Sequence, residues 1–316
     1  MSTSPPPKRD KAPPPELYVS RYGGVWAMTA AGAARNAGAA GNADPARSAD
    51  PARNADPAGN AGAAATTDAA RLAALIREAN TVVALTGAGI SVPSGIPDFR
   101  SPGTGLWEKV NPMEVAHIDA FNRDPERFWS FYSTRFQSLA GKRPNPAHAA
   151  LSTLEQAGLL KAVITQNIDR LHRQAGSREV VEVHGSIDSA SCLTCGGRYP
   201  LKDVRHRHEL DPAGVPRCEC GQPLKPDVVL FGEYLPVAAI EEAQRLAASA
   251  DLMLCIGSSL EVYPVAGLPE LTLAAGGKVA IITQGPTPLD ARAVVRMRGD
   301  VVADLQAVLG ALGLPE

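Results

Sequence analysis

The sequence predicts an α/β protein whose core is a doubly wound parallel sheet, with one small insertion. Two observations predict this fold. Apolar runs of strand length alternate with helical patterns along most of the chain, and these runs are continuously apolar. Such runs are typical of a parallel sheet that helices cover on both faces. Two closely spaced cysteine pairs interrupt the alternation and mark the insertion.

The composition excludes several classes of protein. The 316 residues are 45% apolar and 20% charged, and the formal net charge is −2. A chain so close to neutral lacks the basic surface used for direct nucleic-acid binding or for anionic membranes. No apolar run approaches the roughly 20 residues that span a bilayer, and the first residues lack the apolar segment of a secretory signal. We therefore expect a soluble, cytoplasmic protein. A monomer fits these features, and the oligomeric state stays open.

Residues 1–66 are expected to form a disordered, low-complexity arm. From Ala30 to Arg71 the chain has no Val, Ile, Leu, Met or aromatic residue, so it cannot bury enough apolar surface to offset the entropy of ordering. A repeat of Asn-Ala-Asp-Pro-Ala-Arg begins at Asn42, and alanine is its only apolar residue. This composition favours a solvated tail over a docking arm. The folded region is then expected over 67–316.

The folded region begins at a helix start signal. Thr67 and Asp68 precede an apolar stripe of helical period at Ala69, Leu72 and Ile76. We expect strands at 82–85, 162–165, 180–183, 228–231, 252–256 and 279–282. We expect further helices at 124–140, 146–157, 237–249, 264–275 and 302–312. In such sheets ligands bind beyond the carboxyl ends of the strands.

A glycine-containing loop follows the first strand. Gly87 and Gly89 let the backbone approach a phosphate closely, and a helix start after them supplies amide donors. The dinucleotide fingerprint is incomplete, because Val92 stands where the third glycine belongs and no acidic residue ends a second strand about 20 residues later. These departures argue against a hydride-transferring dehydrogenase. Glycines that serve only the steric fit of the turn are the alternative.

Polar residues follow three further strands at the same edge of the sheet. Gln166, Asn167 and Asp169 come after one strand, His184 ends another, and the small residues 257–259 end a third. A lone histidine is usually structural. This one shares its edge with two amides and a carboxylate, so we predict a functional site there.

Four cysteines occur as two pairs with metal-ligand spacing. Cys192 and Cys195 are followed by Cys218 and Cys220, and a glycine comes after each pair. This spacing predicts a closed, structural zinc site with four thiolate ligands. Four unrelated thiols or two redox pairs are the alternatives. Cys255 lies inside an apolar run and is interpreted as a core residue.

Several segments occur in an order that one family shares. They are GAGISVPSGIPDFRS at 87–101, TQNID at 165–169, HG at 184–185, the cysteine pairs, KPDVVLFGE at 225–233 and GSSLEVYP at 257–264. Together they resemble the sirtuins, which are NAD-dependent protein lysine deacylases. The resemblance covers about 67–316 and implies a Rossmann-like domain, a cofactor loop and helical module at about 97–146, and a zinc module at about 190–224.

The resemblance also implies an activity, with NAD and Zn²⁺ as cofactors and the acylated lysine of proteins as partner. Nicotinamide and O-acyl-ADP-ribose are the implied products, His184 is the implied general base and Asn167 an implied catalytic amide. Implied NAD-binding residues are Gly87, Ala88, Gly89, Ser91, Asp98, Phe99, Arg100, Gln166, Asn167, Asp169, Gly257, Ser258, Ser259, Thr283 and Val301. Implied substrate residues are Tyr132, Arg135, Val229, Phe231, Gly232, Glu233 and Val262.

The chain departs from the family pattern at two places in the folded region. Cys218 and Cys220 have one residue between them where the family usually has two, which tightens the ligand geometry. Thr283 stands where the family commonly has asparagine, so we expect weaker contacts with the adenosine ribose.

The acyl preference has two interpretations. Tyr132 and Arg135 are three residues apart on one helix face and resemble the pair by which some sirtuins bind succinyl- or malonyl-lysine. A plain deacetylase, with Arg135 as an ordinary surface arginine, is the favoured interpretation.

Two rival functions stay open. An ADP-ribosyltransferase or NAD glycohydrolase breaks the same bond of NAD, and the intact segment 225–233 argues against it. A non-enzymatic NAD sensor or scaffold is the second rival, and the presence of His184 argues against that.

Overall fold

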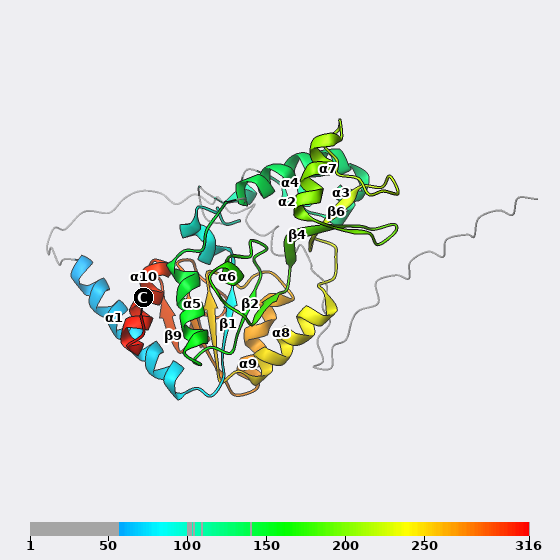
Figure 1. The fold of residues 1–316 in the computed structure, drawn as a ribbon. Coiled ribbons are helices and arrows are strands. Elements are labelled where there is room, and N and C mark those ends of the chain that lie inside the picture. Colours follow the sequence, from blue (N-terminus) through cyan, green and yellow to red (C-terminus); the bar gives the residue numbers. More distant parts are fainter. Residues whose placement is uncertain (1–56, 100–102, 104, 109, 140, 316) are drawn as a thin grey trace, which may run out of the picture.

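The computed structural model describes residues 57–99, 103, 105–108, 110–139 and 141–315, and its core is a six-stranded sheet (Figure 1). The strands are β1 (Val82–Thr86), β2 (Ala162–Thr165), β3 (Val180–Glu182), β7 (Leu252–Ile256), β8 (Lys278–Ile282) and β9 (Val295–Met297). Their order is β3-β2-β1-β7-β8-β9, and every neighbouring pair is parallel. The chain therefore starts near the centre and winds to both edges, which confirms the doubly wound, Rossmann-like prediction.

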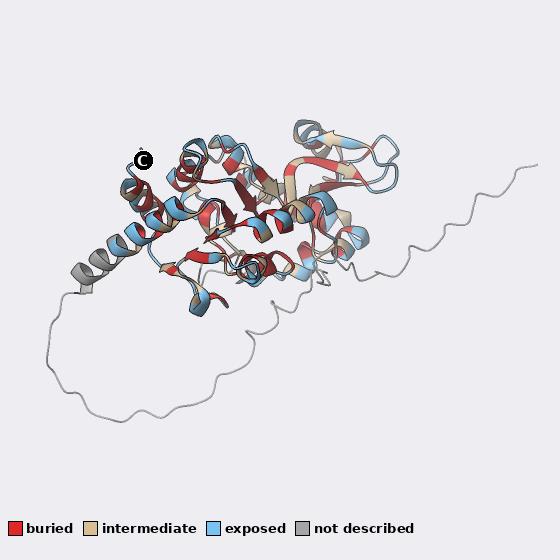
Figure 2. Ribbon diagram, turned by 90° about the horizontal axis from the view of Figure 1, so that it is seen from below, coloured by how far each residue is buried: buried red, intermediate tan, exposed pale blue. Residues whose placement is uncertain are grey.

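Helices cover both faces of this sheet. They are α1 (Pro57–Glu78), α5 (Pro146–Gln156) and α10 (Val301–Leu312) on one face, and α8 (Val237–Ser249) and α9 (Leu268–Ala274) on the other. Val82 and Ala84 of β1 belong to the first apolar cluster, whereas Val83 and Leu85 belong to the second. Alternate residues of one strand thus face two cores, which is why the strand is apolar throughout. In Figure 2 the central strands are red, and the helices are red on their inner sides.

A smaller lobe lies beyond one end of this sheet (Figure 1). It contains an antiparallel sheet in the order β5-β4-β6, with β4 (Gly185–Cys192), β5 (Arg198–Pro200) and β6 (Leu224–Val228). Its helices are α2 (Pro112–Val115), α3 (Ile118–Arg123), α4 (Pro125–Leu139) and α7 (Leu201–Leu210). Trp129 of α4 is 1% exposed, and its indole N–H donates to the carbonyl of Leu224 at 2.9 Å. The helical module (α2–α4) and the cysteine module (β4, β5, α7 and β6) therefore share one core.

The remaining elements are short. They are α6 (Leu171–Gln174) and the 3₁₀ helices η2 (Ala88–Ser94), η3 (Leu106–Glu108), η4 (Val265–Gly267) and η5 (Asp290–Arg292). The expected helix after the glycine loop is therefore a 3₁₀ helix. No helix among the described residues is both long and apolar enough to cross a bilayer.

Two expected boundaries differ from the structure. Helix α1 begins at Pro57, ten residues before the expected start at Thr67, and so includes part of the expected arm. The rest of the arm, 1–56, lies outside the described residues. The expected strand at 228–231 is wrong, because β6 ends at Val228 and pairs with β4 in the small sheet. The run is apolar because Val228 and Leu230 pack in the core of the small lobe while Val229 packs against the large one.

Candidate functional site

The loops after β1 and β7 are in direct backbone contact. The amide of Gly87 donates to the carbonyl of Ile256 at 3.0 Å, and the amide of Gly89 donates to the carbonyl of Gly257 at 2.8 Å. Gly257 has φ +61°, and a Cβ there would lie 2.3 Å from the amide nitrogen of Ile90. This packing alone requires glycine at 257. The amides of Gly87 and Gly89 are already used in this contact, so a phosphate bound here must be held by other N–H donors of the loop.

Three predicted cofactor residues form one hydrogen-bonded group beside this loop. The Ser91 hydroxyl donates to Asp169 Oδ2 at 2.7 Å. The Asn167 side-chain amide donates to Ser91 Oγ at 3.1 Å and to the carbonyl of Gly87 at 3.0 Å. Burial raises the pKa of Asp169, while its hydrogen bonds from Leu171 and Ser91 act in the opposite direction. The structure thus brings residues from the loops after β1 and β2 together.

His184 lies between the two sheets, after β3 and directly before β4. Its Nδ1 is 3.0 Å from the carbonyl oxygen of Gln166, which only accepts, so Nδ1 carries the proton. Nε2 then has the free lone pair, and this buried atom has no hydrogen-bond partner within the described residues. Burial lowers the pKa of His184, so the ring is neutral at pH 7. A buried, unpaired acceptor fits a hydroxyl group of a bound substrate.

Gln166 connects this histidine to the third loop. Its side-chain amide donates to the hydroxyl of Ser258 at 2.9 Å. Ser258 is buried and Ser259 is half-buried. The structure therefore brings the ends of these strands together at one edge of the sheet.

A buried histidine pair, which was not predicted from the sequence, lies next to Ser91 and Thr86. His148 Nε2 lies 3.4 Å from Ser91 Oγ, and His172 Nε2 lies 2.9 Å from Thr86 Oγ1. Burial lowers the pKa to about 4 for His148 and to about 3 for His172. Both rings are therefore neutral and act as hydrogen-bonding supports. One signal was available: Asn145 and His148 have capping-box spacing at the start of α5, and the structure contains that capping box.

The predicted acyl-selectivity pair lies in the helical module. Tyr132 is 7% exposed and stacks on Phe128 with ring centroids 4.3 Å apart. The Arg135 guanidinium lies 5.3 Å from the ring centre of Phe99, a predicted cofactor-loop residue. Burial lowers the pKa of Arg135, and its electrostatic attraction to Tyr132 and Asp169 opposes that shift. Arg135 is therefore directed toward the site rather than toward solvent.

The cofactor loop itself is described in part. Asp98 and Phe99 are half-buried, and the carbonyl of Asp98 accepts from the amide of Leu106 at 3.0 Å. Arg100 lies outside the described residues.

The predicted substrate segments flank His184 and the loop after β7. The amide of Val229 donates to the carbonyl of His184 at 2.9 Å. Phe231 forms an isolated parallel bridge with His117, and Glu233 forms an ion pair with Lys225 at 2.9 Å. Val262 begins the turn into η4, where its carbonyl accepts from the amide of Ala266 at 2.9 Å.

The predicted adenosine residues lie at the far side of the same edge. Thr283 follows β8 and is half-buried, as is Val301 at the start of α10. Arg296 organises this region: its guanidinium donates to the carbonyls of Thr283 and Gly285 and forms an ion pair with Asp290 at 2.9 Å.

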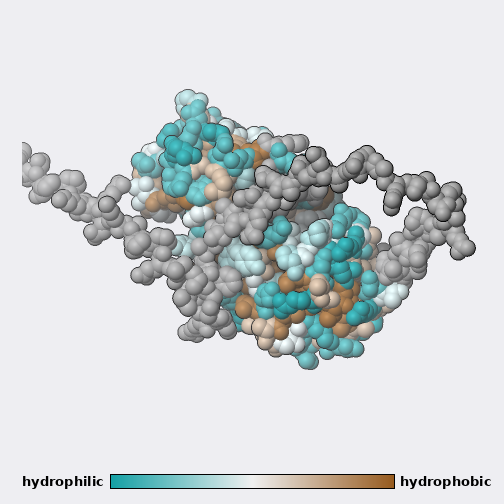
Figure 3. All heavy atoms as spheres, turned by 180° about the vertical axis from the view of Figure 1, so that it is seen from behind, coloured by the Kyte–Doolittle hydropathy of each residue, from teal (hydrophilic) through white to brown (hydrophobic). Residues whose placement is uncertain are grey.

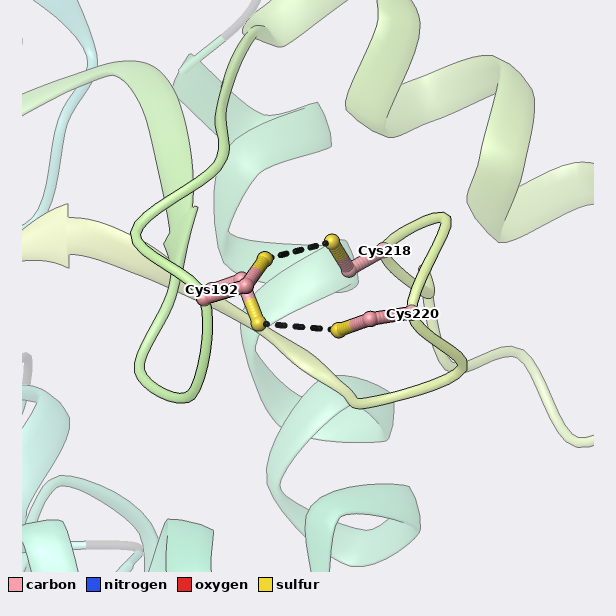
Figure 4. A group of neighbouring side chains, drawn as sticks. Cys192, Cys218 and Cys220 are labelled. Atoms are coloured by element: carbon pink, nitrogen blue, oxygen red, sulfur yellow. Dashed lines mark hydrogen bonds between the residues drawn. The ribbon is translucent and has the colours of Figure 1, made fainter.

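The four predicted metal ligands form a compact cluster (Figure 4). Their sulfur atoms all lie within 4.8 Å of one another, and among the described residues no other group of this kind occurs. Sγ–Sγ distances are 3.5 Å for Cys192 and Cys220 and 3.4 Å for Cys195 and Cys218. Tetrahedral zinc with bonds of about 2.3 Å places its sulfurs about 3.8 Å apart, so the cluster fits that ion. None of these cysteines forms a disulfide.

Comparison with protein families and curated proteins gives matches over most of the folded region. The Sir2 family model matches residues 87–264. An NAD-dependent protein deacetylase of Sulfolobus acidocaldarius is 49% identical over 235 residues, which are 74% of this chain and 91% of that protein. An NAD-dependent protein deacylase of Thermococcus kodakarensis is 45% identical over 238 residues, which are 74% of this chain and 92% of that protein.

Solved structures agree with these matches. A Sir2 complex with a deacetylated p53 peptide and 3′-O-acetyl ADP ribose has a TM-score of 0.74 and 42% identity, covering 78% of this chain and 98% of that one. A Sir2 complex with a p53 peptide and NAD⁺ has a TM-score of 0.71 and 42% identity, covering 77% and 98%. The family model, the relatives and the solved structures all agree, and the chain belongs to the Sir2 family.

Proposed function

We propose that this chain is an NAD-dependent protein lysine deacylase. One observation carries the proposal. The neutral ring of His184 presents an unpaired Nε2 beside the loop that contains Asn167 and Asp169. Relatives at 44–49% identity are named NAD-dependent protein deacetylases or deacylases. Solved relatives bind acetylated or propionylated peptides. Acylated lysine of a protein is therefore the proposed partner.

NAD supplies an electrophilic ribose carbon when its bond to nicotinamide breaks, and the acyl oxygen of the substrate amide is the nucleophile. That oxygen is weakly nucleophilic, so positioning and exclusion of water must supply much of the rate. The family resemblance assigns Phe99 to cover the reacting atoms, and the Arg135 guanidinium lies 5.3 Å from the centre of its ring. Asn167 and Asp169 are suited to orient polar groups, because Ser91 holds both side chains.

His184 then acts as the general base. It accepts a proton at Nε2 from a ribose hydroxyl while Nδ1–H donates to the carbonyl of Gln166. A neutral imidazole is ready for this step at pH 7 because burial lowers its pKa.

We also propose one structural zinc ion per chain, held by Cys192, Cys195, Cys218 and Cys220. All four ligand positions are thiolates, which leaves no open position for catalysis. The ion would hold the loop after β4 against the loop before β6. The Tyr199 hydroxyl, 3.3 Å from Cys218 Sγ, supports the same arrangement.

The preferred acyl group is the acetyl group in this proposal, with succinyl and malonyl groups as the alternative. Arg135 lies near Phe99 and Asp169, two predicted site residues, so its cation is a candidate partner for the carboxylate of a succinyl or malonyl group. Succinyl-, malonyl- and acetyl-peptides are compared on the wild type and on Arg135→Met. A loss of activity confined to the acidic acyl groups assigns Arg135 to their carboxylate. Unchanged selectivity leaves a plain deacetylase.

Mass spectrometry of reactions with NAD and acyl-lysine peptides tests the main proposal. The expected products are the deacylated peptide, nicotinamide and O-acyl-ADP-ribose in equal amounts. ADP-ribose without deacylated peptide would identify an NAD glycohydrolase, and peptide carrying ADP-ribose would identify a transferase. NAD binding without turnover would identify a sensor.

A further inference from the structure

A buried lysine lies between the cysteine module and the loop that carries the proposed substrate residues. Lys225 is the second residue of β6 and is 7% exposed. Its Nζ donates to the carbonyls of Pro226 at 3.0 Å and Val228 at 2.8 Å, and it lies 2.9 Å from Glu233 Oε2. An ammonium group has three N–H donors, so each one is used. A lysine is almost never buried this deeply unless it is paired.

The partner carboxylate closes a tight turn. The amide of Glu233 donates to the carbonyl of Leu230 at 3.1 Å, and the amide of Leu230 donates back to Glu233 Oε2 at 2.9 Å. Gly232 has φ +83°, which is the value that the third residue of a type II turn requires. The oxygen that closes the turn is therefore the same oxygen that Lys225 holds.

Val229 and Phe231 are hydrogen-bonded to other parts of the molecule. The amide of Val229 donates to the carbonyl of His184 at 2.9 Å. Phe231 donates to the carbonyl of Ala116 at 2.9 Å and accepts from the amide of Ile118 at 3.0 Å. Val229 thus depends on the site histidine, and Phe231, inside the turn, depends on the helical module. The Glu233 end of the turn depends on the buried ammonium group, through Glu233 Oε2.

Removing that ammonium group has a local consequence. The carbonyls of Pro226 and Val228 lose a donor, and the carboxylate of Glu233, 23% exposed, loses its cation. The carboxylate can turn to water, because the Glu233 side chain is already partly exposed. The turn then loosens while the aromatic core around Trp129 stays packed.

We propose that Lys225 is a positioning residue for the protein substrate, which fixes the turn at 230–233 and makes substrate affinity depend on a strand of the cysteine module. This inference rests on the proposed function, in which Gly232 and Glu233 flank the acyl-lysine peptide. Lys225 acts through Glu233 and touches no reacting atom.

Lys225→Met in the full chain tests this role. The affinity for a fluorescein-labelled acetyl-lysine peptide is measured by anisotropy, beside KM for NAD, kcat and the zinc content. We expect the peptide to bind about tenfold more weakly, because a charged hydrogen bond is lost. KM for NAD, kcat and zinc are expected to change less than about threefold. Arg198→Met is the matched control: it breaks the 2.8 Å ion pair with Asp227 of the same strand, which does not reach the turn.

A double-mutant cycle with Glu233→Gln separates positioning from a general effect. If Lys225 acts through Glu233, the double variant loses no more affinity than Lys225→Met alone. Wild-type peptide affinity in Lys225→Met, equal losses for peptide and NAD, or losses that multiply in the double variant would each overturn the inference. Should Lys225→Met fail to fold, the double variant carries the measurement, since it leaves no charged group without its partner. A wild-type protein that neither binds acylated peptide nor turns it over would instead overturn the proposed function.

Discussion

The two sheets of the molecule are stabilised by different means. Every residue of β1, β2 and β7 is buried, and these strands lie between two apolar cores. In the small sheet β5 has no buried residue, and only half of the positions in β4 are buried. Figure 3 shows that the outer tip of the smaller lobe is predominantly hydrophilic on the visible face. Apolar burial is sufficient for the large sheet, whereas the small one relies on one shared core and its cysteine cluster.

The site lies where these two regions meet. His184 connects the last residues of β3 to the first of β4, and the turn that Lys225 holds follows β6. The large sheet carries the loops proposed to bind NAD, and the small lobe is expected to set how firmly the protein substrate is held. Damage to each region should therefore have a different signature.

The largest effect is expected from Cys195→Ser, which perturbs only the smaller lobe. Loss of a thiolate should release the zinc ion, lower Tm by about 5 °C or more and abolish deacylation, because a structural zinc contributes folding energy directly. Hydrogen exchange should accelerate in β4–β6 and stay slow in β1 and β7. Cys255→Ala is the control, since Cys255 is buried in β7 away from the cluster and its loss should leave the zinc content unchanged. A zinc-free wild type of full activity would contradict the metal assignment.

His184→Ala should remove catalysis and leave both regions folded. We expect kcat/KM to fall about 10²–10⁴-fold, as is typical when a general base is lost. Zinc content and NAD binding, measured by calorimetry, should stay near the wild-type values. Because burial lowers the pKa of His184, the acid limb of the wild-type kcat/KM profile should lie below pH 6.5. A kcat/KM that is unchanged by the substitution would show that His184 is not the general base.

Acid should weaken the large region through His148 and His172. Their folded pKa values are about 4 and about 3, whereas in the unfolded chain both return to about 6.5. Between these values the unfolded chain binds protons that the folded chain does not, so stability rises with pH and is lost as pH falls from about 6.5 to about 4. Tm measured across this window should decline, and less steeply in His172→Gln. Parallel curves for the two proteins would contradict the assignment.

The large sheet was the more predictable of the two. Its strands carry apolar residues on both faces, and all but β9 fall within a residue or two of the expected ranges. The segment 185–210, which forms β4, β5 and α7, was missed because its residues are mostly polar and its strands owe their order to long-range contacts. The cysteine spacing nevertheless located the cluster itself.

The site was predictable where a motif is local and unpredictable where partners are distant in sequence. Gln166, Asn167 and His184 each follow a recognisable strand, so their shared edge could be expected. The support that His172 gives to Thr86 joins residues 86 positions apart. No local pattern in one sequence reveals such a pair, because the fold brings α6, which carries His172, against the end of β1.

The smallest effect is expected at Thr283, a half-buried residue in the loop after β8. Thr283→Asn supplies a longer side chain with both a donor and an acceptor, and one added neutral hydrogen bond should lower KM for NAD about threefold. The backbone should not move, because Arg296 holds the carbonyl of Thr283 and is itself paired with Asp290. KM for the acyl-peptide and Tm, measured on the same preparation, should therefore stay constant. If KM for NAD does not change, Thr283 does not face the adenosine ribose, and the family departure at this position has no bearing on cofactor affinity.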